Sequence, residues 1–366
     1  MVVGFTKETI GTALNLVKAV VPARPTNPLY AYIYLEGTGD DLVVRAASAE
    51  VDAEVRIPAP GLEFSPLLVP PAFIRAVEAA SGPKVHLAAE EGRIVVSSGT
   101  WEAAVNTAES EGFPTWPDKE GGTKATIGVK ELLRALGAVR YAASKDAWRS
   151  VFRGIVLEFV EGGLRAVASD GYRMAIYDTG IAVPLAGQIL LPVSGADEAV
   201  RLLKEARGEA TLTLHGSFIT LTANTGEFEA SLVVRLLEGE YPDYRRVIPT
   251  EFPTTVVLHA EELAAAVRRV SALSSPKDHR VDIIFDGESR LATLFTEGDY
   301  GRSADAVRAG VDGLTLRQAY DYRYLLDAIE PVEGEVVLRI SGPATPTLIE
   351  PADGGGYKAV VVPLRV

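Results

Sequence analysis

The sequence contains no cysteine. Disulfide bridges, thiolate metal sites and a cysteine nucleophile are therefore excluded, and a reducing compartment is the natural setting for the chain. The opening residues, MVVGFTKETI, lack a basic start followed by a long apolar core and a small-residue cleavage site, so no signal peptide is expected. These two absences together predict a cytoplasmic protein.

Signatures of catalysis are missing as well. The chain has no Gly-x-x-x-x-Gly-Lys-Ser/Thr loop and no His-Glu-x-x-His motif, and the three glycines from Gly354 precede a terminal strand, which favours a hairpin turn. Asp170 and the pair Asp40-Asp41 fit turn positions, because no partner base, nucleophile or third ligand accompanies them. The histidines are scattered without ligand spacing: His86, His215, His259 and His279. We expect no catalytic residue, no metal site and no cofactor.

A membrane-spanning helix is not expected either. The longest uncharged run that we considered, TGIAVPLAGQILLPVSGA at 179–196, contains Pro184 and Pro192 as well as three glycines. These residues would interrupt a spanning helix several times. We predict a loop, a strand and a second loop in this run, and no contact with a membrane.

Charge limits how the chain could bind nucleic acid. The net charge is −13, and no third of the chain carries more basic than acidic residues. Phosphate binding requires clustered lysine and arginine. A chain of this composition can bind a duplex with one face only, while the rest of its surface repels the phosphates, and such binding is weak and mobile.

The chain repeats itself at intervals of about a third of its length. The segments 3–20, 125–143 and 255–274 each combine a short apolar strand, an acid in the first helical turn and apolar residues at helical spacing. The acids are Glu8, Glu131, Glu261 and Glu262. With 366 residues and 47% hydrophobic residues, the chain is long enough for two to three folded domains.

Each third contains a second strand-helix unit, followed by alternating strands. These second units lie at 67–82, 189–208 and 314–334. The sequence therefore predicts an α+β protein of three similar domains, each a duplicated strand-helix-strands unit, with the helices on one side of the sheets. The predicted domains span 1–125, 126–252 and 253–366.

Cations lie on or beside the predicted helices. A helix is expected from Val129 to Tyr141, with its leucines on one face and Lys130, Arg134, Ala138 and Tyr141 on the opposite face. Further cations near the predicted helices are Lys18, Arg24, Arg75, Arg201, Lys204, Arg268 and Arg269. Solvated faces and helix-end charges explain each of them as well as a nucleic-acid surface does.

Three motifs resemble those of the bacterial sliding clamps, the beta subunits of DNA polymerase III. They are SDGYRM at 169–174, PDYRRV at 242–247 and the final residues VVPLRV at 361–366. The segments ARPTNP at 23–28 and EGFPTWPD at 111–118 are also similar to that family, so the resemblance covers the whole chain. The PDYRRV stretch is the most specific of these motifs, because it coincides with the predicted boundary between the second and third domains.

The resemblance implies a ring. Two chains would associate head to tail, closing six domains around duplex DNA with the helices inside and the sheets outside, and DNA would be held without sequence specificity. Strand 101–107 with Val105 would then meet a surface of the partner chain that includes Ala272 and Leu273. The inward cations would be Arg24, Arg75, Lys130, Arg134, Arg201, Lys204, Arg268 and Arg269.

The resemblance also implies a hydrophobic cleft for which the replicative polymerase, the clamp loader and repair proteins compete. Each would bind through a short peptide that carries glutamine and large apolar residues. The apolar residues carried over are Phe152, Met174, Pro242, Val247, Val360, Val362, Pro363 and Leu364. Gly171 would allow close approach, and the polar rim would be Tyr172, Arg173, Arg246, Tyr324 and Arg365.

The chain departs from the family pattern at several of these positions. Tyr172 stands where the family often has histidine, Phe152 stands where leucine is expected, and Leu364 and Val366 are aliphatic variants in the tail. We expect these differences to change the preference among partners without removing the cleft.

Two other classes of function stay open from the sequence. A metal-dependent nucleic-acid enzyme using Asp170, Asp243 and Arg246 would require clustered carboxylates, which the sequence does not show. A structural homo-oligomer that does not bind DNA would account for the repeats but not for the three motifs. The sliding-clamp interpretation is preferred to both.

Overall fold

The structure is a computed structural model that describes residues 3–116, 121–146, 151–160, 163–274 and 278–365. Pro117 and Asp118 of the EGFPTWPD segment and Val366 of the tail lie outside the described residues. The chain forms two compact units, of which the first comprises Met1–Arg134, Val183–Leu185 and Leu191–Leu237. The second comprises Ala135–Ala182, Ala186–Leu190 and Glu238–Val366.

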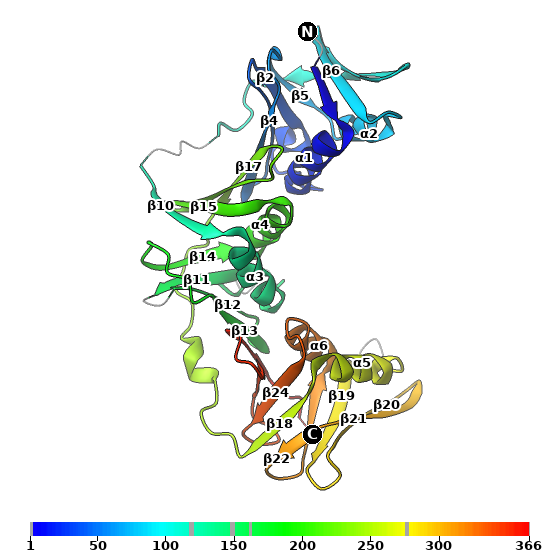
Figure 1. The fold of residues 1–366 in the computed structure, drawn as a ribbon, viewed down its shortest axis with the longest axis vertical. Helices are drawn as coiled ribbons and strands as arrows, with labels where there is room; N and C mark the ends of the chain where they lie inside the picture. The colour runs from blue at the N-terminus through cyan, green and yellow to red at the C-terminus, as the bar shows by residue number, and fades with distance from the viewer. Residues whose placement is uncertain (1–2, 117–120, 147–150, 161–162, 275–277, 366) are drawn as a thin grey trace. The chain divides into compact units, whose positions relative to one another are not determined.

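The elements of the first unit are built on two sheets (Figure 1). Its helices are α1 (Lys7–Val20), α2 (Ala72–Ala79) and α4 (Val193–Glu205), with the short 3-10 helix η1 (Pro28–Ala31). Its strands are β1 (Val3–Thr6), β2 (Ile33–Thr38), β3 (Asp41–Ala47), β4 (Val51–Pro58), β5 (Glu63–Val69), β6 (Lys84–Glu90), β7 (Arg93–Ser98), β8 (Trp101–Asn106), β9 (Ala108–Glu109), β10 (Thr123–Gly128), β15 (Arg207–His215), β16 (Phe218–Asn224) and β17 (Glu229–Arg235).

The second unit has the same kind of construction. Its helices are α5 (Ala260–Ser271) and α6 (Tyr322–Ile329), with η2 (Arg140–Ala142), η3 (Val151–Arg153) and η4 (Tyr244–Val247). Its strands are β11 (Gly154–Val160), β12 (Gly163–Ser169), β13 (Arg173–Asp178), β14 (Gly187–Pro192), β18 (Thr254–His259), β19 (Arg280–Asp286), β20 (Leu291–Gly298), β21 (Gly301–Arg308), β22 (Gly310–Asp312), β23 (Leu316–Asp321), β24 (Glu335–Ile340), β25 (Thr347–Pro351) and β26 (Tyr357–Val361). Helix α3 (Val129–Val139) begins in the first unit and ends in the second.

Large antiparallel sheets explain why there are two units rather than three. A nine-stranded sheet has the order β10-β15-β16-β17-β4-β3-β2-β5-β9, and a second has the order β14-β11-β12-β13-β26-β25-β24-β18-β22. In each sheet, strands from two of the predicted domains are joined by hydrogen bonds, at β17 with β4 and at β13 with β26. The predicted boundaries near 125 and 252 are not settled by this division and stay predictions.

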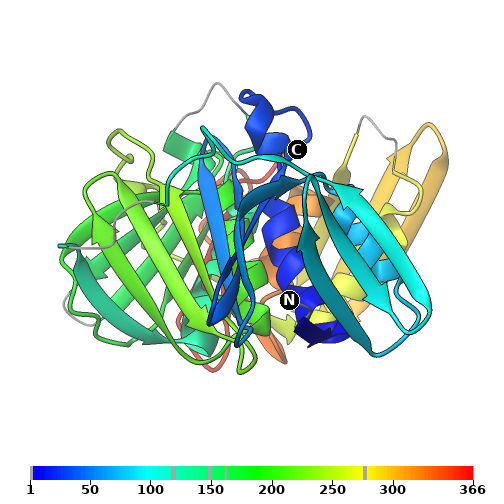
Figure 2. The same ribbon diagram turned by 90° about the horizontal axis from the view of Figure 1, so that it is seen from above.

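The six strand-helix units expected from the sequence are present, and their helices pack on the sheets. In the first unit, α1 contacts α2 and also strands β3 and β4, while α2 contacts β8 (Figure 2). In the second unit, α5 contacts α6 and strands β18 to β21 (Figure 1). The α+β class with helices packed on antiparallel sheets is confirmed.

The start of α1 illustrates why these helices form where they do. The side chain of Thr6 accepts a hydrogen bond from the backbone N–H of Thr9, which satisfies one of the free donors of the first turn. Ile10, Leu14 and Val17 follow at helical spacing and are fully buried. Burial of three large aliphatic side chains outweighs the modest helix propensity of the two β-branched ones.

Two local predictions were wrong. Helix α3 ends at Val139 rather than at Tyr141, and of the residues expected on the exposed face Ala138 is buried and Tyr141 is half-buried. The reason lies in the tertiary structure, because the Tyr141 hydroxyl is hydrogen-bonded to that of Tyr357 at 2.7 Å. The backbone therefore turns into η2 and directs Tyr141 inward.

The uncharged run at 179–196 also differs from its prediction. It contains a loop and strand β14 as expected, but its last residues begin helix α4 instead of a second loop. Gly195 belongs to that helix, and a Cβ there would lie 2.3 Å from Cγ1 of Val234 on β17. Glycine is thus used for close packing of a helix on a sheet rather than for a turn. No helix among the described residues is long and apolar enough to cross a membrane.

Candidate functional site

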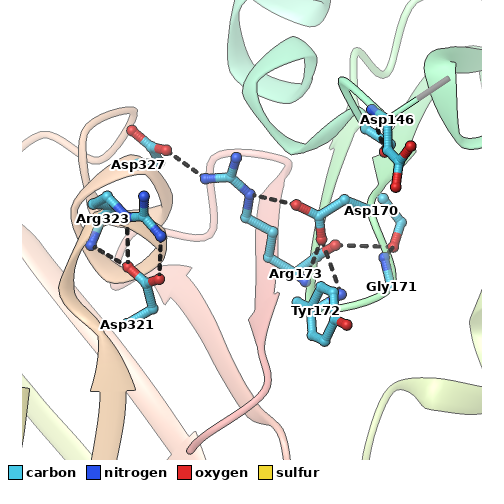
Figure 3. Close-up of polar contacts among 10 residues, drawn as sticks. Asp146, Asp170, Gly171, Tyr172, Arg173, Asp321, Arg323 and Asp327 are labelled. Atoms are coloured by element: carbon cyan, nitrogen blue, oxygen red, sulfur yellow. Dashed lines mark hydrogen bonds and ion pairs between the residues drawn. The ribbon is translucent and has the colours of Figure 1, made fainter. Parts of the chain in front are cut away.

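The SDGYRM motif forms a tight turn between β12 and β13. The carboxylate of Asp170 accepts hydrogen bonds from the backbone N–H groups of Tyr172 at 2.9 Å and Arg173 at 3.0 Å (Figure 3). The Ser169 hydroxyl donates to the carbonyl of Arg173 at 2.9 Å and accepts from the N–H of Gly171 at 3.1 Å. Gly171 has φ +88°, a region that glycine adopts readily. The turn holds the Tyr172 side chain out to solvent.

Arg173 links this turn to helix α6. Its Nε donates to Asp170 at 3.1 Å and its Nη1 donates to Asp327 (Figure 3). The guanidinium also lies over the ring of Tyr324, 4.4 Å from the centroid, and over that of Tyr141 at 5.4 Å. A planar cation that is paired with two carboxylates and stacked on two rings has little freedom to move.

The buried tyrosines beneath Arg173 reinforce this part of the site. The Tyr357 hydroxyl donates to the carbonyl of Ala328 at 2.9 Å and is also bonded to the Tyr141 hydroxyl. Burial raises the pKa of both tyrosines far above the ordinary value, so both hydroxyls stay protonated at neutral pH. They act as structural hydrogen-bonding groups.

The PDYRRV linker is fastened to strand β11 through one buried carboxylate. Glu158 accepts hydrogen bonds from the Tyr244 hydroxyl and from Nη2 of Arg245, both at 2.8 Å. Burial, followed by the hydrogen bond to Glu158, raises the pKa of Tyr244 to about 12. Nearby, the rings of Tyr241 and Phe152 meet edge to face with centroids 5.5 Å apart. These contacts leave Pro242, Arg246 and Val247 of the linker exposed.

The C-terminal tail is held by its main chain. The N–H of Val362 donates to the carbonyl of Tyr172 at 2.9 Å, and the N–H of Leu364 donates to the carbonyl of Ala319 at 2.7 Å. Nη1 of Arg280 donates to the carbonyl of Arg365 at 2.9 Å. Since the backbone makes these contacts, the side chains of Val362 and Leu364 remain exposed while Pro363 is buried.

Four of the residues predicted to bind a partner peptide are large and exposed. They are Tyr172 at 54%, Val247 at 56%, Val362 at 39% and Leu364 at 37% exposure. Tyr172 is in direct contact with the tail through the Val362 hydrogen bond. Large exposed apolar side chains from three motifs distant in sequence are the property expected of a docking surface.

Other predicted residues of the site have different positions. Met174 is only 2% exposed and pairs with Val360, which is also buried, in the register of β13 and β26. These two side chains belong to the core beneath the tail and do not contribute to the surface. Arg246 forms an ion pair with Asp243 at 3.0 Å within the linker itself.

All eight cations predicted to face DNA are exposed. Arg75 lies on α2, Lys130 and Arg134 on α3, Arg201 and Lys204 on α4, Arg268 and Arg269 on α5, and Arg24 in the loop after α1. Two are already paired: Arg201 with Glu198 at 3.4 Å and Arg269 with Asp305 on β21 at 2.6 Å. We expect the charge of Arg269 to contribute less to phosphate binding than that of an unpaired cation.

Of the residues predicted at a dimer interface, Val105 lies on an edge strand, while Ala272 and Leu273 follow helix α5. Val105 is on β8, which ends the sheet β1-β6-β7-β8, and β21 ends the sheet β21-β20-β19-β23. Leu273 follows α5 and is exposed, with its Cδ1 3.9 Å from the position of a Cβ at Gly301 on β21. Ala272, just before Leu273, is exposed as well.

Sequence reasoning missed several residues of these surfaces. Asp327 pairs with Arg173, and its spacing of three from Tyr324 on a helix could have indicated a shared face. Tyr300 is a large exposed side chain in the turn between β20 and β21, where the sequence Glu297-Gly-Asp-Tyr-Gly signals a hairpin. The contact of Arg280 with the tail has no local signal.

The carboxylates proposed for an enzyme have structural partners. Asp170 caps its own turn, and Asp243 accepts from the N–H of Arg245 at the start of η4. The described residues contain no cluster of three or more histidine, aspartate or glutamate side chains that could hold a metal ion. Both carboxylates hold the local backbone, and the arrangement supplies surfaces for binding.

Solved structures define the class of fold. A DNA polymerase sliding clamp of Pseudomonas aeruginosa, crystallised with a ligand, matches this chain with TM-score 0.87 and 26% identity, covering 100% of each chain. The DNA polymerase III beta subunit of Thermotoga maritima matches with TM-score 0.91 and 24% identity, covering 100% of this chain and 99% of its own. The chain therefore has the three-domain sliding clamp fold.

Family comparisons agree along the whole sequence. The models of the N-terminal, central and C-terminal domains of the DNA polymerase III beta subunit match residues 1–117, 126–243 and 245–365. The beta sliding clamp of Caulobacter vibrioides is 28% identical over 97% of both chains, and that of Chlamydia muridarum is 26% identical over 99% of this chain and 98% of its own. The chain belongs to the DNA polymerase III beta subunit family, the bacterial sliding clamps. Members of this family are processivity factors rather than catalysts.

Proposed function

We propose that two copies of this protein close head to tail into a ring around duplex DNA and tether the replicative polymerase, the clamp loader and repair proteins to it. The observation that carries this proposal is the set of exposed apolar side chains from the turn, the linker and the tail, in a chain whose fold is that of the sliding clamps. In this proposal the protein catalyses no reaction, requires no cofactor and works on DNA in the cytoplasm.

The open sheet edges support the ring. Within the described residues, β8 pairs only with β7 and β21 pairs only with β20. An unpaired edge strand presents a row of N–H and C=O groups that another strand can pair with. Joining β8 of one copy to β21 of the next would pair both open edges. In a dimer this pairing would occur twice, with Val105, Ala272 and Leu273 at each of the two interfaces.

The distribution of charge supports passive tracking of the duplex. Exposed lysines and arginines lie on helices α2 to α5, while the chain as a whole carries a net charge of −13. Cations on helix surfaces can follow phosphates without reading bases, and the surplus of acid elsewhere disfavours binding to any other surface. The bound ring is then free to slide.

The partner site would use burial for affinity and fixed polar groups for orientation. Tyr172, Val247, Val362 and Leu364 supply apolar surface, and Arg173 is held rigidly by Asp170 and Asp327. Pro242 and Pro363 stiffen the linker and the tail, which reduces the entropy lost when a peptide binds. We expect affinities near micromolar, or about −8 kcal/mol, for a single peptide.

A retention experiment tests the ring. The protein is loaded onto a nicked circular DNA and moved into roughly 0.5 M salt, where the Debye length is about 4 Å and surface charges are screened. A topologically closed ring stays on the circle and is lost when the circle is linearised. Equal loss from both DNA forms would show that contacts, and not encirclement, hold the protein.

A further inference from the structure

Asp282 on strand β19 is a buried carboxylate outside the proposed partner site. It is 4% exposed and accepts hydrogen bonds from two arginines. Arg280 donates through Nε at 2.7 Å and through Nη2 at 2.8 Å, one to each oxygen, and Arg317 donates through Nε at 2.9 Å. Burial opposes ionisation of Asp282, but the hydrogen bonds from Arg280 and Arg317 outweigh it and lower its pKa. The carboxylate is therefore ionised at neutral pH.

The third nitrogen of the Arg280 guanidinium, Nη1, is directed at the tail. Two of its nitrogens are fixed by Asp282, and because the guanidinium is planar, the direction of Nη1 is fixed too. Nη1 donates to the carbonyl of Arg365 at 2.9 Å. A residue on β19 thus holds the backbone 85 positions later in the chain.

Two main-chain hydrogen bonds among the described residues hold the tail together with this contact. They join Val362 to Tyr172 and Leu364 to Ala319, and Ala319 is the cross-strand partner of Asp282. Leu364 therefore forms an isolated antiparallel bridge with Ala319 of β23. Loss of the Arg280 contact would leave this segment with the two main-chain hydrogen bonds at Val362 and Leu364, so we expect it to leave this position more often.

We propose that Arg280, oriented by Asp282, is a positioning residue that keeps the C-terminal tail in the conformation that accepts a partner peptide. This inference rests on the proposed partner site. Neither side chain needs to touch the peptide. If the tail is in the peptide-binding conformation for only a fraction of the time, the apparent Kd for the peptide rises by the inverse of that fraction. The Arg280 contact increases the time that the tail spends in this conformation.

Arg317 provides a matched control on the same carboxylate. It shares Asp282 with Arg280, but its other contact is a stack on Phe295, 5.0 Å from the ring centroid. Replacement of either arginine removes one of the two hydrogen-bonding partners named for Asp282. Only replacement of Arg280 removes a hydrogen bond to the tail.

The test measures binding kinetics on the full-length dimer with a fluorescent peptide that carries glutamine and large apolar residues. Arg280→Ala should lower the association rate about tenfold and leave the dissociation rate within about twofold, as expected when fewer molecules are competent to bind. Arg280→Lys, which can still reach the carbonyl, should recover part of the loss. Arg317→Ala should change neither rate by more than about twofold.

Hydrogen exchange on the free protein supplies a second readout. Arg280→Ala should lower the protection of the Leu364 amide, whereas Arg317→Ala should not. An unchanged association rate, a loss confined to the dissociation rate, or equal effects of the two arginines would overturn the inference. Failure of the partner site itself would be visible separately, because the wild-type protein would then not bind the peptide at all or would bind it equally after removal of the tail.

Discussion

Arg173 on strand β13 and Asp327 on helix α6 form an ion pair across 154 positions of sequence. Arg173 is largely buried, is paired with Asp170 as well, and lies over the ring of Tyr324. Because its charge has little access to bulk water, its partners compensate for the lost hydration. The pair fixes the turn that presents Tyr172 relative to the helix behind it.

The first prediction concerns the stability of this pair. Arg173→Ala leaves Asp170 and Asp327 without their shared cation and should lower the free energy of unfolding by about 3 kcal/mol. Arg323→Ala removes a more exposed arginine, paired with Asp321 at the N-cap of α6, and should cost less than about 1 kcal/mol. Urea denaturation compares the two variants. Similar losses in both would show that burial of Arg173 has no special role.

The second prediction concerns the tail. Removal of Val362 to Val366 should abolish binding of the partner peptide while the ring still assembles on DNA. A milder change, Leu364→Ala, should weaken peptide binding about tenfold, because an exposed leucine that a peptide covers contributes through burial. Leu314→Ala, at an exposed leucine in the loop between β22 and β23, is the matched control. Fluorescence anisotropy that shows unchanged affinity after truncation would place the partner site elsewhere.

The third prediction concerns ring closure. Burial of Leu273 between two chains would contribute about 1.5–3 kcal/mol, and a charge there would have to be desolvated on association. Leu273→Asp should therefore yield a folded monomer, whereas Leu314→Asp should remain a dimer. Sedimentation at micromolar concentration distinguishes them. A dimer in both cases would remove Leu273 from the interface.

The fourth prediction concerns Asp52 on β4. Burial raises the pKa of its carboxyl to about 6, against an ordinary value of 3.8. Since the folded state holds the proton more tightly, this group favours folding below about pH 3.8, and the contribution is lost as the pH rises through about 6. Asp52→Asn should stabilise the protein at pH 8 by on the order of 1–3 kcal/mol and have little effect at pH 4. If the gain in stability from Asp52→Asn did not vary with pH, the raised pKa of Asp52 would not be its cause.

The sequence predicted those parts of the fold that depend on local spacing. Apolar residues at helical intervals after a short strand, as in the segment from Val3 to Val20, identify a strand-helix unit because the pattern and the element occupy the same residues. What it could not predict depends on distant partners. The end of α3 and the burial of Tyr141 are set by Tyr357, and nothing near Tyr141 in the sequence indicates that contact.

In the candidate site, too, some features follow from local sequence and others depend on distant contacts. The three motifs identified the turn, the linker and the tail through a family resemblance. Val247, Val362 and Leu364 of the predicted apolar lining and Tyr172 of the predicted polar rim are large and exposed. The resemblance could not distinguish surface from core, so it included Met174 and Val360, which the sheet buries. It also gave no sign of Arg280 or Asp282, because their role comes from the pairing of β19 with β23, the strand that contacts the tail.

The hydrogen bonds between β17 and β4, and between β13 and β26, have a consequence for any attempt to dissect this chain. Excision of a single domain near residue 125 or 252 would leave the middle of a nine-stranded sheet open to solvent. Each new edge would offer a template for pairing with other molecules, and the fragments should aggregate. The three repeats therefore cannot be expressed or engineered one at a time without exposing such an edge.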